Sequence, residues 1–433
     1  MSETRSGPDR SLDGFHSWWK ELTERSAFRV ERIPFADLRQ WRVDSATGDI
    51  RHDSGRFFTV EGLQVHSERG PVPSWSQPII NQPEIGILGI LVKRFDGVPH
   101  YLMQCKMEPG NVNILQLSPT VQATRSNFTR AHRGSQVAYL EYFTDLRPGR
   151  VLVDVLQSEH GSWFLRKRNR NMVVEVQEEV PLQENFRWLT LEQIGELLRV
   201  DNLVNMDART VLSCLPLSHT FGDAAADTAL RSWFTEICAT HNVRTQSIPL
   251  REVQRWERRA DEIAHEDGHH FKVIAVSVQA STREVSSWTQ PLFQPCGLGV
   301  VAFLTRRVAG QVQVLAHARA EPGFVDVVEI GPTVQYQPSS FPGGSPPFAD
   351  LVRDATPEQI RYDTVLSEEG GRFHSAENRY MVLEIDDDLP EPLPEDYRWL
   401  TLHQLTELLA HRNYVNVQAR TLVCAMRLTL GLG

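Results

Sequence analysis

The sequence Phe186-Arg-Trp-Leu-Thr-Leu191 returns late in the chain as Tyr397-Arg-Trp-Leu-Thr-Leu402. In both places the threonine precedes the pattern Leu-x-x-(Ile/Leu)-x-x-Leu-Leu, which is typical of an amphipathic helix that begins after an N-cap residue. The aromatic and apolar residues before the threonine favour a short strand. The chain is therefore predicted to contain the same strand-to-helix unit twice.

Matching segments occur along almost the whole chain, in the same order in both copies. The clearest pairs are Ser74-Trp-Ser-Gln-Pro78 with Ser287-Trp-Thr-Gln-Pro291, Glu108-Pro-Gly110 with Glu321-Pro-Gly323, Pro119-Thr-Val-Gln122 with Pro332-Thr-Val-Gln335, Asn169-Arg170 with Asn378-Arg379, and Asn202-Leu-Val-Asn205 with Asn413-Tyr-Val-Asn416. The period is far longer than a solenoid unit, so we expect two domain-sized copies. We place the first copy at 15–216 and the second at 228–433, with a disordered tail at 1–14 and a linker at 217–227.

Each copy is predicted to follow the same plan. It opens with an amphipathic helix, near 15–22 and 230–237, because apolar residues recur there every three or four positions. The middle is rich in strand patterns bounded by glycine and proline, and the end is helical. We therefore expect an α+β protein in which each copy is a mixed or antiparallel sheet flanked by helices.

Composition and charge exclude several classes of function. The 433 residues include 45 Lys and Arg against 55 Asp and Glu, a net charge of −10, whereas a nucleic-acid protein needs a basic face. No apolar run approaches the roughly 20 residues that cross a bilayer, and the first residues lack the apolar core of a signal peptide. Five scattered cysteines without a Cys-x-x-Cys pair indicate a reduced, cytoplasmic protein without a disulfide framework or zinc site.

The strand expected at 312–321 places His317, Arg319 and Glu321 on one face, because side chains alternate along a strand. The first copy has a glutamine, a lysine and a glutamate at the matching positions, which are Gln104, Lys106 and Glu108. Such a face lies either in solvent or in a wet pocket, since burial of unpaired polar groups is costly. The repetition of a basic residue followed by glutamate favours a pocket.

Two polar loops that carry glycine lie between strand patterns, one in each copy. The first loop contains Ser158, Glu159, His160, Gly161 and Ser162, and the second contains Ser367, Glu368, Glu369, Gly370, Gly371 and Arg372. Such a loop can be a plain hairpin turn, or its backbone N–H groups can bind an anion such as a diphosphate. The sequence leaves both interpretations open.

Further binding candidates lie near these segments. Arg170 and Arg379, each preceded by an asparagine (Asn169 and Asn378), could form bidentate contacts with phosphate. Flat faces for stacking a base or sugar are offered by Trp75 and Trp288, although a core position would explain either tryptophan equally well. Other polar candidates in the second copy are Thr333, Gln335, Tyr336 and Tyr380.

Taken together, these segments resemble the NDP-hexose 2,3-dehydratases of deoxysugar biosynthesis, from Phe15 to Leu428. The resemblance implies a Nudix-like fold for each copy and a homodimeric, cytoplasmic enzyme. Nudix hydrolases carry an REx2EE helix, but neither Arg251-Glu252 nor Arg283-Glu284 is followed by the Glu-Glu pair. We therefore do not expect metal-dependent diphosphate hydrolysis, and the fold would be reused to hold a nucleotide.

The resemblance also implies a dTDP-4-keto-6-deoxyhexose substrate that loses its C2 hydroxyl as water. The product is a labile 3,4-diketo sugar, which a separate NADPH-dependent 3-ketoreductase reduces. Family members are thought to hold dTDP-sugar in both copies, with one pocket catalytic. The route needs a base for the C3 proton, an acid for the departing hydroxyl and a donor for the enolate oxygen, but no redox cofactor or metal.

The second copy is the richer in proton-transfer groups, so we expect catalysis by His317, Arg319, Glu321 and Tyr336, with Arg319 as the oxyanion donor. We expect Trp75, the first loop and Asn169-Arg170 to hold the substrate in one copy. Their counterparts would be Trp288, Thr333, Gln335, the second loop, Asn378, Arg379 and Tyr380. Which copy is catalytic stays open, and the alternative function is a non-catalytic nucleotide-sugar binding protein.

Overall fold

The computed structural model describes residues 8, 11–69, 72–124, 137–144, 149–217, 224–280, 285–340, 344–386, 389 and 392–432. Most of the tail expected at 1–14, and residues 218–223 of the expected linker, lie outside the described residues. The first helix begins at Asp13, and a helix already covers 224–227 of the expected linker. We call the two copies the first half and the second half.

The first half contains the helices α1 (Asp13–Arg25), α3 (Glu141–Thr144), α4 (Leu191–Leu197) and α5 (Met206–Ser213). Its strands are β1 (Phe28–Ile33), β2 (Trp41–Val43), β3 (Ile50–His52), β4 (Thr59–Ser67), β5 (Ser74–Asn81), β6 (Gly86–Phe95), β7 (Val98–Met107), β8 (Leu115–Ser118), β9 (Val121–Ala123), β10 (Gly149–Ser158), β11 (Arg168–Val176) and β12 (Phe186–Leu189).

The second half repeats this order with the helices α6 (Ala224–Thr240), α7 (Ala349–Arg353), α8 (Leu402–Leu409) and α9 (Val417–Thr429). Its strands are β13 (Val243–Ile248), β14 (Trp256–Arg258), β15 (Glu262–His265), β16 (Phe271–Ala280), β17 (Ser287–Pro295), β18 (Gly299–Val308), β19 (Gln311–Ala320), β20 (Val328–Gly331), β21 (Val334–Tyr336), β22 (Ile360–Ser367), β23 (Glu377–Glu384) and β24 (Tyr397–Thr401).

Each half has one seven-stranded mixed sheet. In the first half the strand order is β10-β11-β6-β7-β12, with β8 beside β7 and β9 beside β6, and the second half repeats this pattern around β18 and β19. The pairs β6–β11 and β18–β23 are parallel, and the other pairs in these sheets are antiparallel. Residues 86–93 of β6 are all buried, which explains their continuous apolar pattern, because a central strand is covered on both faces.

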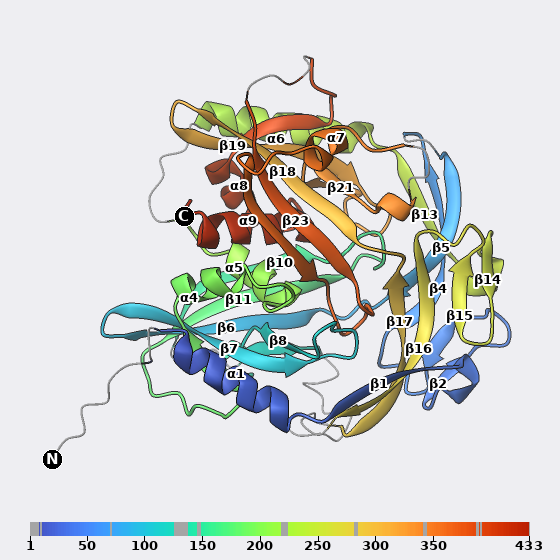
Figure 1. Ribbon diagram of the computed structural model, residues 1–433. Coiled ribbons are helices and arrows are strands. Elements are labelled where there is room, and N and C mark those ends of the chain that lie inside the picture. Colours follow the sequence, from blue (N-terminus) through green and yellow to red (C-terminus); the bar gives the residue numbers. More distant parts are fainter. Residues whose placement is uncertain are drawn as a thin grey trace.

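The two five-stranded sheets exchange strands between the halves. Strand β1 of the first half pairs with β16 of the second, and β13 of the second half pairs with β4 of the first (Figure 1). The sequence could not reveal this exchange, because the two copies carry the same pattern and either strand would fit either sheet. The halves are therefore interlocked rather than simply placed one after the other.

The repeated threonines cap their helices as predicted. Thr190 is the N-cap of α4 and Thr401 is the N-cap of α8, each in a reciprocal capping box with the glutamine three residues later. The helices α5 and α9 pack against each other where the halves meet, near the middle of the molecule in Figure 1. The protein is thus a mixed α/β protein with four antiparallel or mixed sheets in two repeated halves. No helix in the described part of the chain is long and apolar enough to cross a membrane.

Candidate functional site

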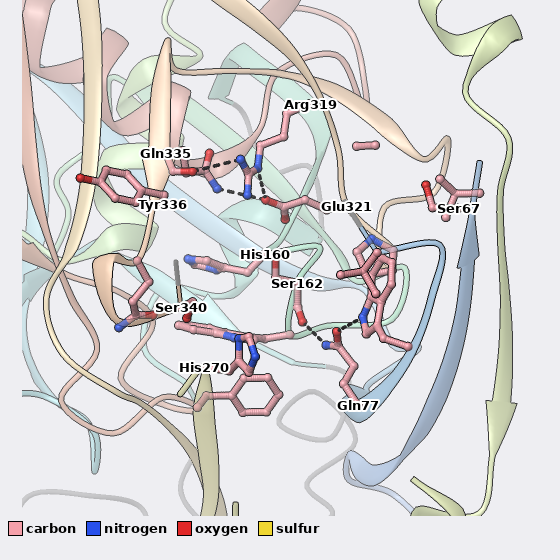
Figure 2. A pocket seen from close by; sticks show the side chains of 18 of the residues that line it. Ser67, Gln77, His160, Ser162, His270, Arg319, Glu321, Gln335, Tyr336 and Ser340 are labelled. Atoms are coloured by element: carbon pink, nitrogen blue, oxygen red, sulfur yellow. Dashed lines mark hydrogen bonds and ion pairs between the residues drawn. The ribbon is translucent and has the colours of Figure 1, made fainter. Parts of the chain in front are cut away.

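A large pocket, with a volume of about 1310 Å³, lies where the halves meet. The second half contributes His317, Arg319 and Glu321 from β19 and the strand end that follows it, together with two residues of β21. The first half contributes Trp75 and Gln77 from β5 and two residues of its polar loop. Figure 2 labels lining residues from both halves, among them Gln77, His160, Arg319, Glu321, Gln335 and Tyr336.

Glu321 is held in a tight polar group on the second half's sheet. Its Oε1 accepts hydrogen bonds from Arg319 Nε at 2.9 Å and from Gln335 Nε2 at 3.0 Å (Figure 2). Glu321 is only 3% exposed, and its Oε2 has no hydrogen-bond partner among the described residues. This arrangement fixes the guanidinium of Arg319 in the pocket wall, so the sequence-based placement of the two residues on one face is confirmed.

His317 lies beside this group and is oriented by Asp396 and Tyr397, at the start of the neighbouring strand β24. Its Nε2 is 2.9 Å from Asp396 Oδ2, and its ring stacks on Tyr397 with centroids 4.3 Å apart. Burial lowers the pKa of His317, although the hydrogen bond to Asp396 opposes the shift. The imidazole is therefore neutral near pH 7, and a carboxylate that accepts the Nε2 proton leaves the lone pair on Nδ1. Sequence reasoning missed Asp396, although it directly precedes the repeated Tyr397-Arg-Trp segment.

His160 reaches the pocket from the first half. Its ring is buried, and its Nε2 is 2.8 Å from Oε2 of Glu368 in the second half. Burial by itself would lower the pKa of His160, but the hydrogen bond and the charges of Glu368 and Glu159 raise it above the ordinary value. Burial would likewise raise the pKa of Glu368, but the charge of His160 and the hydrogen bond hold it at about 2. The loop that the sequence left open as a hairpin or an anion site thus supplies a buried histidine whose pKa is raised by its carboxylate neighbours.

The first half contains a matching polar group built on different chemistry. Lys106 Nζ donates to Gln122 Oε1 at 2.6 Å and lies 3.3 Å from Glu108 Oε1. None of these three residues lines the large pocket described above. Other positions differ more strongly between the halves, since His317, Tyr336 and His160 correspond to Gln104, Ala123 and Glu369.

The tryptophan of each Ser-Trp-x-Gln-Pro segment is tied to the polar loop of its own half. Trp75 Nε1 donates to Gln77 Oε1 at 2.9 Å, and Gln77 Nε2 donates to the carbonyl of Ser162 at 2.7 Å. Trp288 and Gln290 make the same contacts with the carbonyl of Gly371, each at 2.8 Å. The glutamine was visible in both copies of the sequence but was not chosen as a site residue. Pocket residues that sequence reasoning did not choose include Gln77, Trp163, His241, Trp256, His265, His270 and Asp396.

The structure does not bring the two predicted phosphate-binding arginines to the pocket. Arg170 makes a bidentate ion pair with Asp154 on the neighbouring strand, at 2.7 and 2.6 Å. Arg379 makes the same pair with Asp363, at 2.8 and 2.5 Å. Each guanidinium already has a carboxylate in the position that we expected a phosphate to take, and neither arginine lines the pocket. Phosphate contacts by these arginines stay a prediction, and they would require each guanidinium to exchange its carboxylate partner.

The other predicted binding residues divide into two groups. Trp75, His160, Ser162, Gln335 and Asn378 line the pocket, as do all four predicted catalytic residues. Thr333 has a structural role instead, because its buried hydroxyl accepts from Leu304 N–H and donates to the Leu315 carbonyl. Predicted residues that do not line the pocket are Ser158, Glu159, Gly161, Asn169, Arg170, Trp288, Thr333, Ser367, Glu368, Glu369, Gly370, Gly371, Arg372, Arg379 and Tyr380.

Comparison with known proteins shows the family to which the sequence is similar. A family model described as NDP-hexose 2,3-dehydratase matches residues 12–215 and 227–426, one segment in each half. A dTDP-4-dehydro-6-deoxy-alpha-D-glucopyranose 2,3-dehydratase from Saccharopolyspora spinosa is 52% identical, over 97% of this chain and 92% of its own length. Proteins of the same name from Amycolatopsis orientalis (51% identical; 98% and 92% covered) and Streptomyces violaceoruber (52% identical; 96% of both) are similar throughout. The chain belongs to the NDP-hexose 2,3-dehydratase family.

Proposed function

We propose that this protein is a hydro-lyase that dehydrates dTDP-4-dehydro-6-deoxyglucose across C2 and C3. The observation that carries the proposal is the match, at 51–52% identity over nearly the full chain, to three proteins named for this reaction. The pocket supports it, since it brings a neutral histidine, an arginine and a carboxylate together in about 1310 Å³. A pocket of this size is large enough for a nucleotide sugar.

We place the reaction on the second half's sheet. His317 removes the C3 proton through Nδ1, while Asp396 orients the ring and stabilises the imidazolium that forms. Negative charge then develops on the C4 oxygen, and the Arg319 guanidinium, fixed by Glu321, stabilises it. Tyr336 borders the same space and would contact the sugar.

Trp75 provides a flat apolar surface in the pocket wall on which the thymine can stack. The indole Nε1 donates to Gln77 Oε1, and the carbonyl of Ser162 fixes Gln77 by accepting from its Nε2. The sugar then lies toward the opposite wall, which carries Arg319 and His317. This orientation puts the base against the first half and the reacting carbons against the second.

Several finer features are also proposals. We propose that each half is Nudix-like, which the mixed sheet with one parallel pair supports, and that the halves span 15–216 and 228–433. The family resemblance supports a cytoplasmic homodimer, and the five free cysteines agree with a reducing compartment. A labile diketo product calls for an NADPH-dependent 3-ketoreductase to consume it.

The test is to incubate purified protein with dTDP-4-keto-6-deoxyglucose in EDTA and to follow the mixture by mass spectrometry. We expect the substrate to lose one water and free dTDP to appear as the diketo sugar decomposes. If the substrate is unchanged but protects the protein against thermal unfolding, the protein is instead a nucleotide-sugar binding protein. If there is neither turnover nor protection, the substrate class is wrong.

A further inference from the structure

We propose that His160, a residue of the first half, donates the proton to the departing C2 hydroxyl in the pocket built on the second half's sheet. The inference deepens the proposed function and rests on it. It makes the site composite: the base and the oxyanion donor come from one half, and the acid comes from the other.

The hydrogen bonds around Glu368 require an ionised carboxylate. Oε1 accepts from Asn378 Nδ2 and from the Tyr380 hydroxyl, both at 2.6 Å, while Oε2 lies 2.8 Å from His160 Nε2. An ionised carboxylate only accepts hydrogen bonds, so these three donors fit that form. Glu368 is 2% exposed, and a buried carboxylate of this kind needs a compensating positive charge. His160 is the group in contact with it that can carry one.

The surroundings of His160 favour a charged imidazole. Oε2 of Glu159 lies 3.9 Å from Nδ1, too far for a hydrogen bond but close enough for attraction. Glu321 adds a further negative charge from the second half. The ring stacks on Trp163, with centroids 5.6 Å apart and an angle of 16° between the rings.

Only one of the two ring nitrogens of His160 is committed. Nε2 is bound to Glu368, whereas Nδ1 is buried and has no hydrogen-bond partner within the described part of the chain. The ring nevertheless lines the pocket, below Arg319, Glu321 and Gln335 in Figure 2. A proton on Nδ1 is therefore not committed to any acceptor in the described chain and is the one that we assign to the transfer, while Glu368 accepts the Nε2 proton and fixes the orientation of the ring.

His160 and His317 are set for opposite tasks. Burial keeps His317 neutral, as a base must be, while two flanking carboxylates keep His160 charged, as an acid must be. Environments that push two titratable groups apart in this way assign the base and the acid of a reaction. The equivalent of His160 in the second half is Glu369. Of the two polar loops, only the loop of the first half therefore carries a histidine at this position.

The proton balance closes without another reactant. His317 Nδ1 takes the C3 proton, and the C3–H electron pair forms the enolate. The enolate then collapses: the C4 carbonyl re-forms, a C2=C3 bond forms, and the C2–O bond breaks with its electron pair, while His160 Nδ1 protonates the departing oxygen to give water. Tautomerisation of the C3 enol adds a proton to C2 and releases the hydroxyl proton, which restores both histidines.

The decisive experiment separates the two proton transfers. Purified His160→Gln and His317→Gln proteins are incubated with dTDP-4-keto-6-deoxyglucose in D₂O, and both water loss and deuterium at C3 of the recovered substrate are measured by mass spectrometry. We expect His160→Gln to lose at least about 100-fold in kcat but still to exchange the C3 proton. We expect His317→Gln to lose both activities. Binding of dTDP, measured by calorimetry, should change by less than about 3-fold in His160→Gln.

His100→Gln is the matched control, because His100 is a buried histidine on β7 that does not line the pocket. It should keep wild-type turnover. If wild type turns over and His160→Gln retains turnover within about 3-fold, or loses C3 exchange together with dehydration, the acid role is wrong while the proposed function stands. If wild type itself does not dehydrate the substrate, the proposed function fails first.

A second variant covers the case in which His160→Gln does not fold. Glu368→Gln removes the negative charge that holds the proton on His160. In a plot of kcat against pH, the fall at high pH reports the pKa of an acid in the enzyme–substrate complex. This fall should therefore occur at lower pH in Glu368→Gln than in wild type. A fall at an unchanged pH would overturn the inference.

Discussion

A buried glutamate at the centre of the molecule allows a quantitative test of the electrostatics. Glu329 lies on β20, is fully buried, and accepts a hydrogen bond from the Ser158 hydroxyl of the first half at 2.5 Å. Burial raises its pKa to about 8, although the Ser158 bond and the charge of Arg420 oppose the shift. The corresponding residue of the first half is Gln116, whose Nε2 donates a hydrogen bond to the Ser367 hydroxyl at 2.5 Å. We predict that Glu329→Gln stabilises the protein in a pH-dependent way.

The magnitude follows from linkage. The folded-state pKa of Glu329 lies above the unfolded value of 4.5. The protonated side chain therefore contributes fully to the free energy of unfolding below about pH 4.5, and this contribution is lost as pH rises toward 8. At pH 7 the loss is about 3 kcal/mol, from roughly 1.4 kcal/mol per pH unit. Glutamine cannot ionise and should avoid this loss. For a chain of this length about 1 kcal/mol corresponds to about 1 °C in Tm, so we expect a gain of about 3 °C at pH 7.

The assay is thermal unfolding of wild type and Glu329→Gln between pH 5 and pH 8.5. The difference in Tm should be near zero at pH 5 and should grow with pH. Gln116→Glu is the matched control, because it places an acid at the equivalent position of the other half and should destabilise the protein with the opposite sign. A difference that does not change with pH, or a Glu329→Gln protein that is less stable at pH 8, would show that Glu329 is ionised and paired in the folded state.

The remaining predictions concern the pocket and the contact between the halves. Arg319→Ala should lower kcat by about 100- to 1,000-fold, with dTDP affinity by calorimetry changed little; an effect on affinity alone would remove its oxyanion role. His317→Ala and Glu321→Gln should each lower turnover by orders of magnitude, whereas Lys106→Ala and Glu108→Gln should retain it. The reverse pattern in the same assay would assign catalysis to the first half. Arg170→Ala should change dTDP affinity by less than about 3-fold, because its guanidinium already binds Asp154; a larger loss would restore the phosphate-binding interpretation.

Part of the fold followed from local pattern. Thr190 and Thr401 were predicted as N-caps and are N-caps, since a cap depends on residues within one turn. The exchange of β1 and β13 could not be predicted, because it depends on which of two equivalent sheets each strand joins. The face carrying His317, Arg319 and Glu321 followed from alternation, which is also local.

The parts of the site that escaped prediction depend on contacts between distant segments. His160 meets Glu368 across the boundary between the halves, and no spacing in the sequence encodes that approach. The ion pair of Arg170 could not be predicted for a related reason. Its partner Asp154 lies on an adjacent strand, and the pairing of those strands decides whether the guanidinium is free for a phosphate.

The two halves share the residues that hold them together but differ in those that titrate in the pocket. Arg209 donates to the Ser367 carbonyl of the second half at 2.7 Å, and Arg420 donates to the Ser158 carbonyl of the first half at 2.5 Å. Each fully buried arginine thus fixes the start of the other half's polar loop. The two contacts are equivalent, and both join the first half to the second.

Because the backbone arrangement is duplicated, the chemical difference between the halves must come from side chains. The large pocket has a histidine where the first half has Gln104, and receives His160 where the opposite loop carries Glu369. One copy of the framework therefore carries a histidine whose pKa is lowered and faces another whose pKa is raised. The other keeps the same architecture, with Lys106 and Glu108 paired to each other.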